Sequence, residues 1–166
     1  MRPTDTHKKH NATSRPLAEQ HYYHVSAWWS SARTGLAKAD SSPTAIHFTA
    51  PLEFGGMEGR WTPEELLLAA VAGCYTTTLR TLATKARVEL TDLQVEASAS
   101  VCRSRAGYRI DAIELRPRVK IASAPDRERA LALIQKAEGM CLVSRSLGVP
   151  VTFTPQLDDA SAASSS

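Results

Sequence analysis

The chain has 166 residues, 43% of them hydrophobic, and a formal net charge of +3 at pH 7. This length supports one domain with a substantial core, or two small domains. The basic excess is mild and no basic run carries interleaved aromatic residues, so we expect no nucleic-acid partner. We also expect neither a signal peptide nor a membrane span, because the chain shows no long uncharged apolar stretch.

The three cysteines, Cys74, Cys102 and Cys141, are an odd number and widely spaced. Such a set favours reduced thiols in a cytoplasmic protein over a disulfide scaffold. Several histidines lie near the N-terminus, but their spacing fits no closed ligand set with cysteine, so we expect no metal site. These histidines are His7, His10, His21 and His24.

Residues 1–20 are polar and charged, and we expect them to form a disordered arm. Two β-prone runs follow, at residues 22–31 and 44–49. Arg33 comes directly after the first run, and Gly35 is expected to make the turn that follows it. Taken alone, this arginine would be an ordinary exposed side chain.

A glycine-rich loop at residues 51–60 lacks the lysine and the hydroxyl residue of a phosphate-binding loop. It leads into a helix predicted over residues 63–87, because Thr62 can cap the helix and Glu65 can complete a capping box. The residues that follow are apolar on every side, which predicts a buried helix. This helix carries the thiol of Cys74.

Residues 93–104 alternate between apolar and polar side chains and predict a half-buried strand, with Cys102 on its more polar face. A turn around Gly107 and a second strand over residues 108–121 complete a hairpin. Pro117 indicates an edge or a bulge in the second strand. Cys102 has no neighbours that suggest chemistry, so we expect it to be structural.

A second helix follows the hairpin, and Gly139 is expected to break or kink it just before Cys141. A short strand at residues 149–153 comes next. We expect a single domain over residues 21–157, followed by a disordered serine- and alanine-rich tail at residues 158–166.

The two cysteine motifs are specific. A helix that opens Thr-Pro-Glu-Glu-Leu carries Cys74 ten residues after its first glutamate, and Cys141 opens the run Cys-Leu-Val-Ser-Arg-Ser-Leu. Together with the order β-β-helix-β-β-helix-β, they resemble the OsmC/Ohr family of osmotically inducible and organic hydroperoxide resistance proteins, and its OsmC-like branch in particular. The resemblance covers roughly residues 27–157. It implies an α+β OsmC-like fold, with antiparallel sheets around two central buried helices in an intertwined homodimer.

The resemblance also implies a cysteine-based hydroperoxide reductase with peroxiredoxin-type chemistry. Cys74 then corresponds to the peroxidatic cysteine, Cys141 to the resolving cysteine, Glu64 to the carboxylate at the helix start and Arg33 to the arginine after the first strand. A peroxide would oxidise Cys74 to a sulfenic acid, which condenses with Cys141 to a disulfide. The family implies no bound cofactor, and an external dithiol such as a lipoylated protein as the reductant.

A reactive thiol must be ionised near neutral pH, whereas a free cysteine has a pKa of about 8.5. Cys74 lies too far inside its helix for the helix dipole to act on it, and burial raises the pKa of a thiol. We therefore expect a cation, Arg33, to stabilise the thiolate and the charge on the leaving oxygen, with Glu64 orienting the guanidinium.

Glu64 and Cys74 are separated by about 15 Å along a straight helix, so one helix cannot place both around one guanidinium. Two alternatives follow. Glu64 lies before the regular helix and folds back, or it serves the Cys74 of a partner subunit.

The apolar surroundings of the thiol favour an organic hydroperoxide over hydrogen peroxide, and they include Leu67, Leu68, Val71 and Met140. A second hypothesis is a catalytically silent protein of the same family, which binds an apolar ligand or a partner and whose cysteines report the redox state. Serine hydrolysis is not indicated, because Ser144 has no convincing His and Asp partners in the sequence.

Overall fold

The computed structural model describes residues 20–159 and has the α+β organisation that the sequence predicts. The described part of the chain opens with a three-stranded antiparallel sheet in the order β1, β2, β3. Its strands are β1 (Val25–Ser31), β2 (Thr34–Ala39) and β3 (Ile46–Thr49). β1 and β3 lie within the two β-prone runs, whereas β2 is a strand that the pattern does not predict.

The turn between β1 and β2 lies earlier than expected, at Ala32 and Arg33, where Ala32 has a φ of 45°. Gly35 is therefore inside β2 and not in a turn. It lies against the ring of Phe48 on β3, and a Cβ at this position would overlap that ring. The glycine allows a close approach between two strands, a reason that the local sequence does not reveal.

The turn η1 (Leu52–Phe54) and the glycine-rich loop lead into helix α1 (Pro63–Ala86). The predicted capping box is confirmed: the Glu65 amide donates to the Thr62 hydroxyl at 3.2 Å, and the Thr62 amide donates to the Glu65 carboxylate at 2.8 Å. The helix is regular from its first residue and ends at Arg87, which adopts a φ of 56°.

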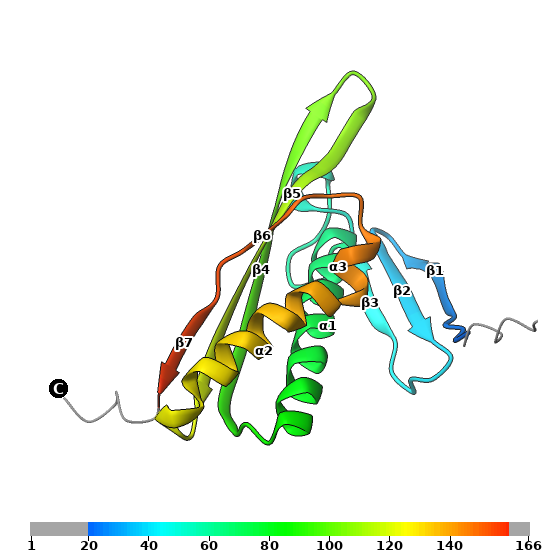
Figure 1. The fold of residues 1–166 in the computed structure, drawn as a ribbon. Coiled ribbons are helices and arrows are strands. Elements are labelled where there is room, and N and C mark those ends of the chain that lie inside the picture. Colours follow the sequence, from blue (N-terminus) through cyan, green and yellow to red (C-terminus); the bar gives the residue numbers. More distant parts are fainter. Residues whose placement is uncertain (1–19, 160–166) are drawn as a thin grey trace, which may run out of the picture.

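β4 (Leu90–Ser104) and β5 (Gly107–Ile121) form the predicted hairpin, whose tip extends beyond the rest of the fold (Figure 1). The pairing register shifts between Ser100 and Val101. Beyond this shift Val101 is 51% exposed and Cys102 is half-buried, the reverse of the predicted arrangement. A bulge adds local twist, so a strict two-residue alternation does not hold across it.

β5 is a central strand, with β4 on one edge and β6 (Val151–Phe153) and β7 (Gln156–Asp159) paired in parallel on the other. This sheet is therefore mixed and not purely antiparallel as expected. Pro117 lies neither at an edge nor at a bulge. It falls between the residues of β5 that pair with β6 and those that pair with β7. No strand of the described chain pairs with it on that side, so its missing N–H costs no hydrogen bond between strands. β7 also carries the fold beyond the expected domain end at residue 157; the rest of the expected tail and nearly all of the expected arm lie outside the described residues.

The turn η2 (Ala124–Asp126) precedes α2 (Arg127–Met140) and the short α3 (Leu142–Ser146). The expected break at Gly139 is wrong, because a helix tolerates glycine at a cost of only about 1 kcal/mol. The break comes at Cys141, whose backbone is extended with φ −63° and ψ 108°. It redirects the chain so that α3 packs against α1.

The apolar surface of α1 is only partly used by the chain itself. Its buried side chains recur at every fourth position, and they are Val71, Tyr75, Leu79 and Ala83. By length and hydropathy α1 would qualify as a membrane span. It packs along β4 and α2. Only 22% of its most apolar stretch is buried by these contacts. The expectation of a helix buried on every side is therefore wrong for a single chain, since its opposite face has no neighbour within residues 20–159.

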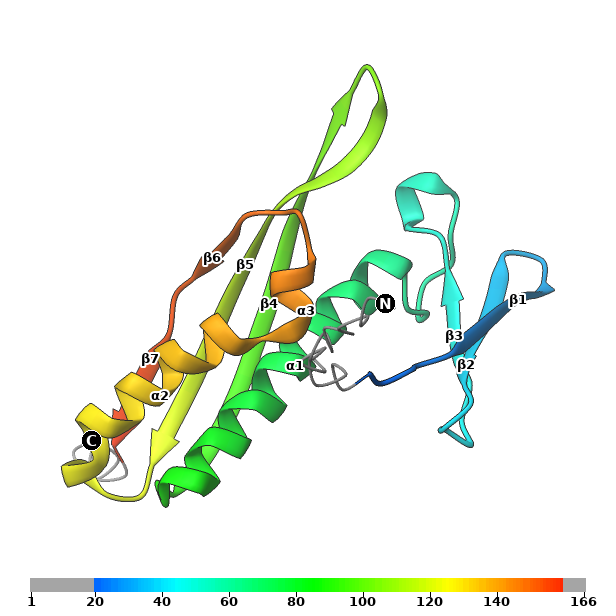
Figure 2. The same cartoon turned by 45° about the vertical axis from the view of Figure 1, so that its right-hand side comes forward.

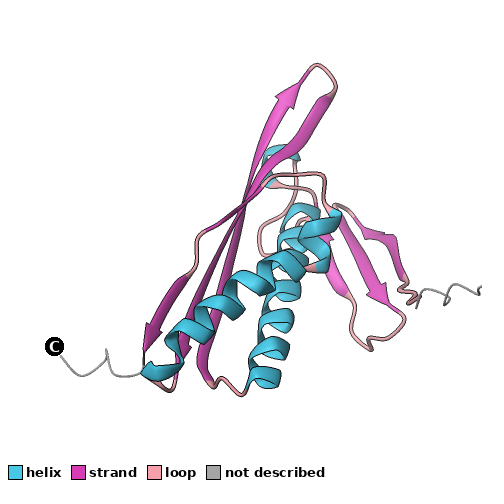
Figure 3. Ribbon diagram, in the orientation of Figure 1, coloured by secondary structure: helices cyan, strands magenta, loops and turns pink. Residues whose placement is uncertain are grey.

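Figures 1 and 3 show α1 and α2 on one face of the mixed sheet, with the three-stranded sheet beyond the N-terminal end of α1. Figure 2 shows the same separation from another side. The hydrophobic core lies between the helices and the mixed sheet, and no residue of β1, β2 or β3 belongs to it within the described chain. Its buried members are Val71, Tyr75, Leu79, Val88, Ile113, Leu115, Val119, Ile121, Ala130, Ile134, Ala137, Cys141 and Leu157.

Candidate active site

Two thiols that are far apart in the sequence meet between α1 and the junction of α2 and α3. Cys74 is half-buried on α1, and its sulfur accepts a hydrogen bond from the Val143 amide at 3.5 Å. Cys141 is fully buried, and its thiol points to the Val71 carbonyl oxygen at 4.0 Å. The two thiols also contact each other, and both are free. The helix break at Cys141 produces this arrangement, because it turns α3 and its first amides toward α1.

The surroundings of the two thiols push their pKa values in opposite directions. Burial raises the pKa of Cys74, but hydrogen bonds from the Val143 amide, the Cys141 thiol, the Leu142 amide and the Thr78 hydroxyl outweigh it, so its pKa lies below the ordinary value. Burial also raises the pKa of Cys141, and here hydrogen bonds from Ser144 oppose it only in part. Cys74 is thus the thiol that is more readily ionised, and Cys141 is the one held as a thiol.

Within one chain, hydrogen bonds and not a cation lower the pKa of Cys74. Arg33 is exposed in the turn between β1 and β2, is not among the groups that lower the pKa of Cys74, and forms no ion pair with any residue from 20 to 159. Its backbone is nevertheless fixed, because the Thr49 hydroxyl donates to the Arg33 carbonyl at 2.8 Å and accepts from the Met57 amide at 3.2 Å. The side chain therefore projects from a well-anchored turn.

Glu64 occupies the second position of the regular helix, so the alternative in which it lies before the helix and folds back is excluded. Its Oε2 atom is buried and has no hydrogen-bond partner among the described residues. The carboxylate lines a cavity of about 380 Å³, whose wall includes Arg109 and two rings, Phe54 and Tyr108, that meet edge to face at 5.1 Å. An unpaired buried carboxylate oxygen is costly, and among the described residues neither Arg109 nor any other group donates to it.

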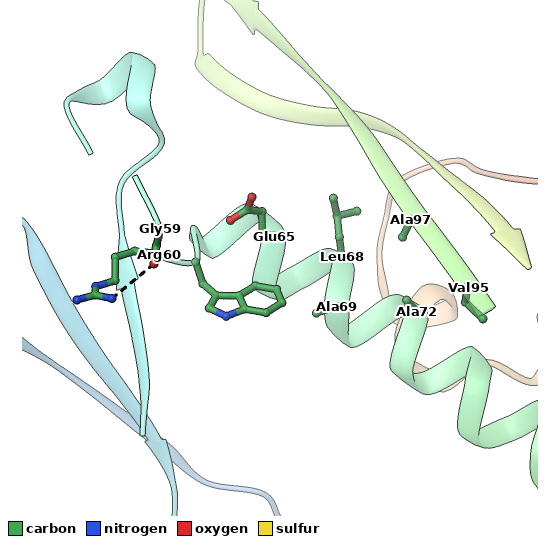
Figure 4. A pocket seen from close by; sticks show the side chains of 9 residues that line it. Gly59, Arg60, Glu65, Leu68, Ala69, Ala72, Val95 and Ala97 are labelled. Atoms are coloured by element: carbon green, nitrogen blue, oxygen red, sulfur yellow. Dashed lines mark hydrogen bonds between the residues drawn. The ribbon is translucent and has the colours of Figure 1, made fainter. Parts of the chain in front are cut away.

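A larger cavity of about 640 Å³ lies along α1 and opens beside β4 (Figure 4). Its lining is mainly apolar, with Arg60 and Glu65 as its charged members. The apolar side chains are Trp61, Leu68, Ala69, Ala72, Val95 and Ala97. Neither Cys74 nor Cys141 lines this cavity, and Ala72 and Cys74 point to nearly opposite sides of the helix because each residue turns it by about 100°.

Two of the sequence-predicted site residues, Cys74 and Cys141, are therefore brought together, whereas Arg33 and Glu64 lie apart from them within one chain. Cys102 is on the hairpin and does not act on either thiol. Among residues 20–159, no three His, Cys, Asp or Glu side chains are grouped to hold a metal ion, and the ring of His24 instead contacts Asp40 at 3.0 Å.

Sequence reasoning missed the polar groups that act directly on the thiols. Thr78 follows Cys74 by one helical turn, and Ser144 follows Cys141 by three residues, both spacings that bring side chains together on a helix. That spacing was the available signal. The Val143 amide could not have been found in this way, because its position depends on how α3 packs against α1.

Comparisons with known proteins agree with this fold. The family model for OsmC-like proteins matches residues 55–156, which include both cysteines and Glu64 but not Arg33. The uncharacterized protein YmaD of Bacillus subtilis is 31% identical over 134 residues, covering 79% of this chain and 89% of the relative. Peroxiredoxin OsmC of Escherichia coli is 33% identical over 104 residues, covering 63% of this chain and 71% of the relative.

Solved structures show the same fold at lower identity. An OsmC-like protein of unknown function from Vibrio cholerae is 18% identical, with a TM-score of 0.74 over 82% of this chain and 99% of its own. An organic hydroperoxide resistance protein from Elizabethkingia anophelis is 20% identical, with a TM-score of 0.68 over 86% of this chain and 100% of its own. With a matching family model and a relative above 30% identity, the chain belongs to the OsmC/Ohr family of OsmC-like proteins.

Proposed function

We propose that this protein is a thiol-dependent peroxidase that reduces organic hydroperoxides, with Cys74 as the attacking thiol and Cys141 as the resolving thiol. The observation that carries the proposal is the contact between the two thiols, with the pKa of Cys74 lowered and that of Cys141 raised. A half-exposed thiol that ionises readily can react with a peroxide. A buried thiol beside it, which stays neutral, is available for the second step.

The proposed reaction has three steps. The Cys74 thiolate attacks one peroxide oxygen, the O–O bond breaks, and the products are a Cys74 sulfenic acid and an alcohol. Cys141 then displaces the hydroxyl group of the sulfenic acid, which gives a disulfide and water. An external dithiol, for example a lipoylated protein, reduces the disulfide by thiol–disulfide exchange and is itself oxidised. Such a cycle requires a reducing compartment, so we place the protein in the cytoplasm.

The roles of Arg33 and Glu64 follow from what one chain lacks. Among residues 20–159, the buried oxygen of Glu64 has no donor and Arg33 has no carboxylate partner. The regular start of α1 keeps Glu64 about 15 Å along the axis from its own Cys74. We therefore infer a homodimer in which Arg33 and Glu64 pair and serve a Cys74 across the interface, where the guanidinium stabilises the charge on the leaving oxygen.

The decisive experiment counts free thiols before and after one equivalent of cumene hydroperoxide. Wild type should lose two thiols per chain, Cys141→Ser should lose one as a sulfenic acid, and Cys74→Ser should lose none. Cys102→Ser is the matched control and should still lose the same two thiols as wild type. Unchanged thiol counts in wild type would contradict the peroxidase proposal.

One observation favours a second candidate, a catalytically silent protein that binds an apolar ligand. The cavity of about 640 Å³ is large and mainly apolar, and neither thiol lines it. Two results together would replace the first function with this second one. Thiol counts would stay unchanged with peroxide, and an apolar fluorescent probe would bind to wild type but not to Leu68→Arg. Binding of the probe together with peroxide consumption would instead assign the cavity to the substrate's apolar part.

A further inference from the structure

Ser144 is a buried polar side chain that the proposed reaction does not yet use. It is 8% exposed and lies on α3, in the turn that follows Cys141. Its hydroxyl donates to the Cys141 carbonyl oxygen at 3.3 Å, and its hydroxyl and amide also reach the Cys141 thiol. A hydroxyl has a single proton, so it can donate to only one of these two acceptors at a time.

We propose that Ser144 is a positioning residue for the resolving step: its hydroxyl turns from the Cys141 carbonyl to the Cys141 sulfur as that sulfur ionises. The inference rests on the proposed peroxidase function and specifies how its second step is controlled. Ser144 touches neither the peroxide nor Cys74, and it keeps its own proton throughout. Its effect is on how fast Cys141 reacts, and hence on how long the sulfenic acid survives.

The ionisable groups around Cys141 determine when the Ser144 hydroxyl has its largest effect. We infer that this is after Cys74 has been oxidised. From α1 these ionisable groups are Cys74 and Tyr75, and the carboxylate of Glu138 on α2 acts on Tyr75. On β6 the ring of Phe153 packs against Tyr75. Burial raises the pKa of Tyr75, so the phenol stays neutral.

In the reduced protein both burial and Cys74 raise the pKa of Cys141. Oxidation converts Cys74 from a thiolate to a neutral sulfenic acid, which removes its charge from the pair. Burial is then the main obstacle to ionisation of Cys141. The hydrogen bonds of Ser144 are the interactions that oppose it.

The step itself is balanced without any further reactant. The Cys141 thiolate attacks the Cys74 sulfur, the S–S bond forms and the S–O bond breaks. Hydroxide leaves and takes up the proton that Cys141 lost, which gives water. Cys141 is oxidised, the sulfenic sulfur is reduced, and both end in the disulfide.

The test follows the sulfenic acid and the disulfide separately, by rapid quenching and mass spectrometry, after adding one equivalent of cumene hydroperoxide to Ser144→Ala. Sulfenic acid should form at the wild-type rate. Loss of the hydrogen bond should raise the pKa of Cys141 further and so leave less of it as thiolate near neutral pH. Because a more basic thiolate is also more nucleophilic, disulfide formation should be about threefold slower near neutral pH. Above the pKa of Cys141 in both proteins, the variant should be no slower than wild type.

Two further variants separate this role from packing. Ser146→Ala removes an exposed hydroxyl of the same helix, which donates to the Leu142 carbonyl at 2.8 Å, and should change neither step. Ser144→Thr keeps the hydroxyl and should restore disulfide formation near neutral pH.

Slower disulfide formation at every pH in Ser144→Ala would indicate a packing defect and overturn the inference, as would an unchanged rate near neutral pH. The peroxidase proposal fails separately, if Cys141→Ser forms no sulfenic acid. The two failures are therefore distinguishable in the same set of samples.

Discussion

The two halves of this molecule differ in how complete they are within one chain. The half built from α1, α2 and the mixed sheet contains the hydrophobic core and both thiols of the proposed reaction. The other half, with the three-stranded sheet and the start of α1, contributes nothing to that core within the described residues. It exposes large apolar side chains, among them Trp28, Trp29 and Trp61, and contains an unpaired buried oxygen on Glu64.

This difference separates the two parts of the proposed site. The thiol part has its donors in the same chain, because the first amides of α3 and two hydroxyls reach the sulfurs. In the arginine and carboxylate part, Arg33 forms no ion pair and the buried oxygen of Glu64 has no hydrogen-bond partner within residues 20–159. This contrast supports the proposed homodimer, in which a second copy of the chain covers the exposed apolar side chains and supplies a partner for the buried oxygen of Glu64.

The largest expected effect tests the self-sufficient half through its stability. Ile134→Ala removes a fully buried core side chain and should lower the free energy of unfolding by about 3 kcal/mol. Ile46→Ala removes a side chain of β3 that is 43% exposed and should cost about 1 kcal/mol or less if the sheet stands alone. Chemical denaturation of both variants gives the comparison. Equal, large losses would show that the three-stranded sheet is covered in solution.

The next effect tests whether the open half is completed by a partner. Arg33→Ala should lower kcat/KM by about 100-fold, since it removes a group proposed to stabilise the leaving oxygen. Mixed dimers of one Arg33→Ala chain and one Cys74→Ser chain should recover about half of the wild-type activity, because one shared site then escapes both substitutions. Purified heterodimers with two different tags allow this measurement. No recovery would place both residues of each site in one chain and contradict the shared site.

A smaller effect concerns the ionisation of the two thiols. The pKa of Cys74 is lowered and that of Cys141 is raised, so the Cys74 thiolate is present at a lower pH. As pH rises, alkylation of Cys74 should therefore reach its plateau first, and near neutral pH it should be at least about tenfold faster than alkylation of Cys141. Peptide mass spectrometry after brief iodoacetamide treatment measures both rates. Faster alkylation of Cys141 would reverse the assignment of the attacking and resolving thiols.

The smallest expected effect concerns the start of α1, where the two halves of the molecule meet. Thr62→Ala removes the hydroxyl that accepts from the Glu65 amide, and should cost about 1 kcal/mol of stability. Because the capping box lies at the start of α1, we expect fraying there to disturb Glu64 and leave the pKa of Cys74 unchanged. Ser42→Ala, on the exposed turn before β3, is a matched control for loss of a hydroxyl. A changed alkylation rate of Cys74 in Thr62→Ala would show that the two halves are coupled through the helix.

The sequence by itself determined the elements whose signals are local. The capping box of Thr62 and Glu65, the hairpin with its glycine turn and the two cysteine motifs all lie within short segments, where propensity and spacing act directly. These features were sufficient to indicate the α+β class and the OsmC/Ohr family. They also identified Cys74 and Cys141, which the fold brings together.

Only the tertiary structure decided the features that depend on contacts between distant segments. Gly35 is needed because the Phe48 ring approaches it, and Pro117 is tolerated because two parallel strands leave a gap beside it. The lowered pKa of Cys74 depends on the Val143 amide. The break between helices α2 and α3 at Cys141 directs this amide toward α1. A hydrogen bond across 69 residues has no local signature in the sequence, so the sequence suggested a cation where the fold supplies backbone amides.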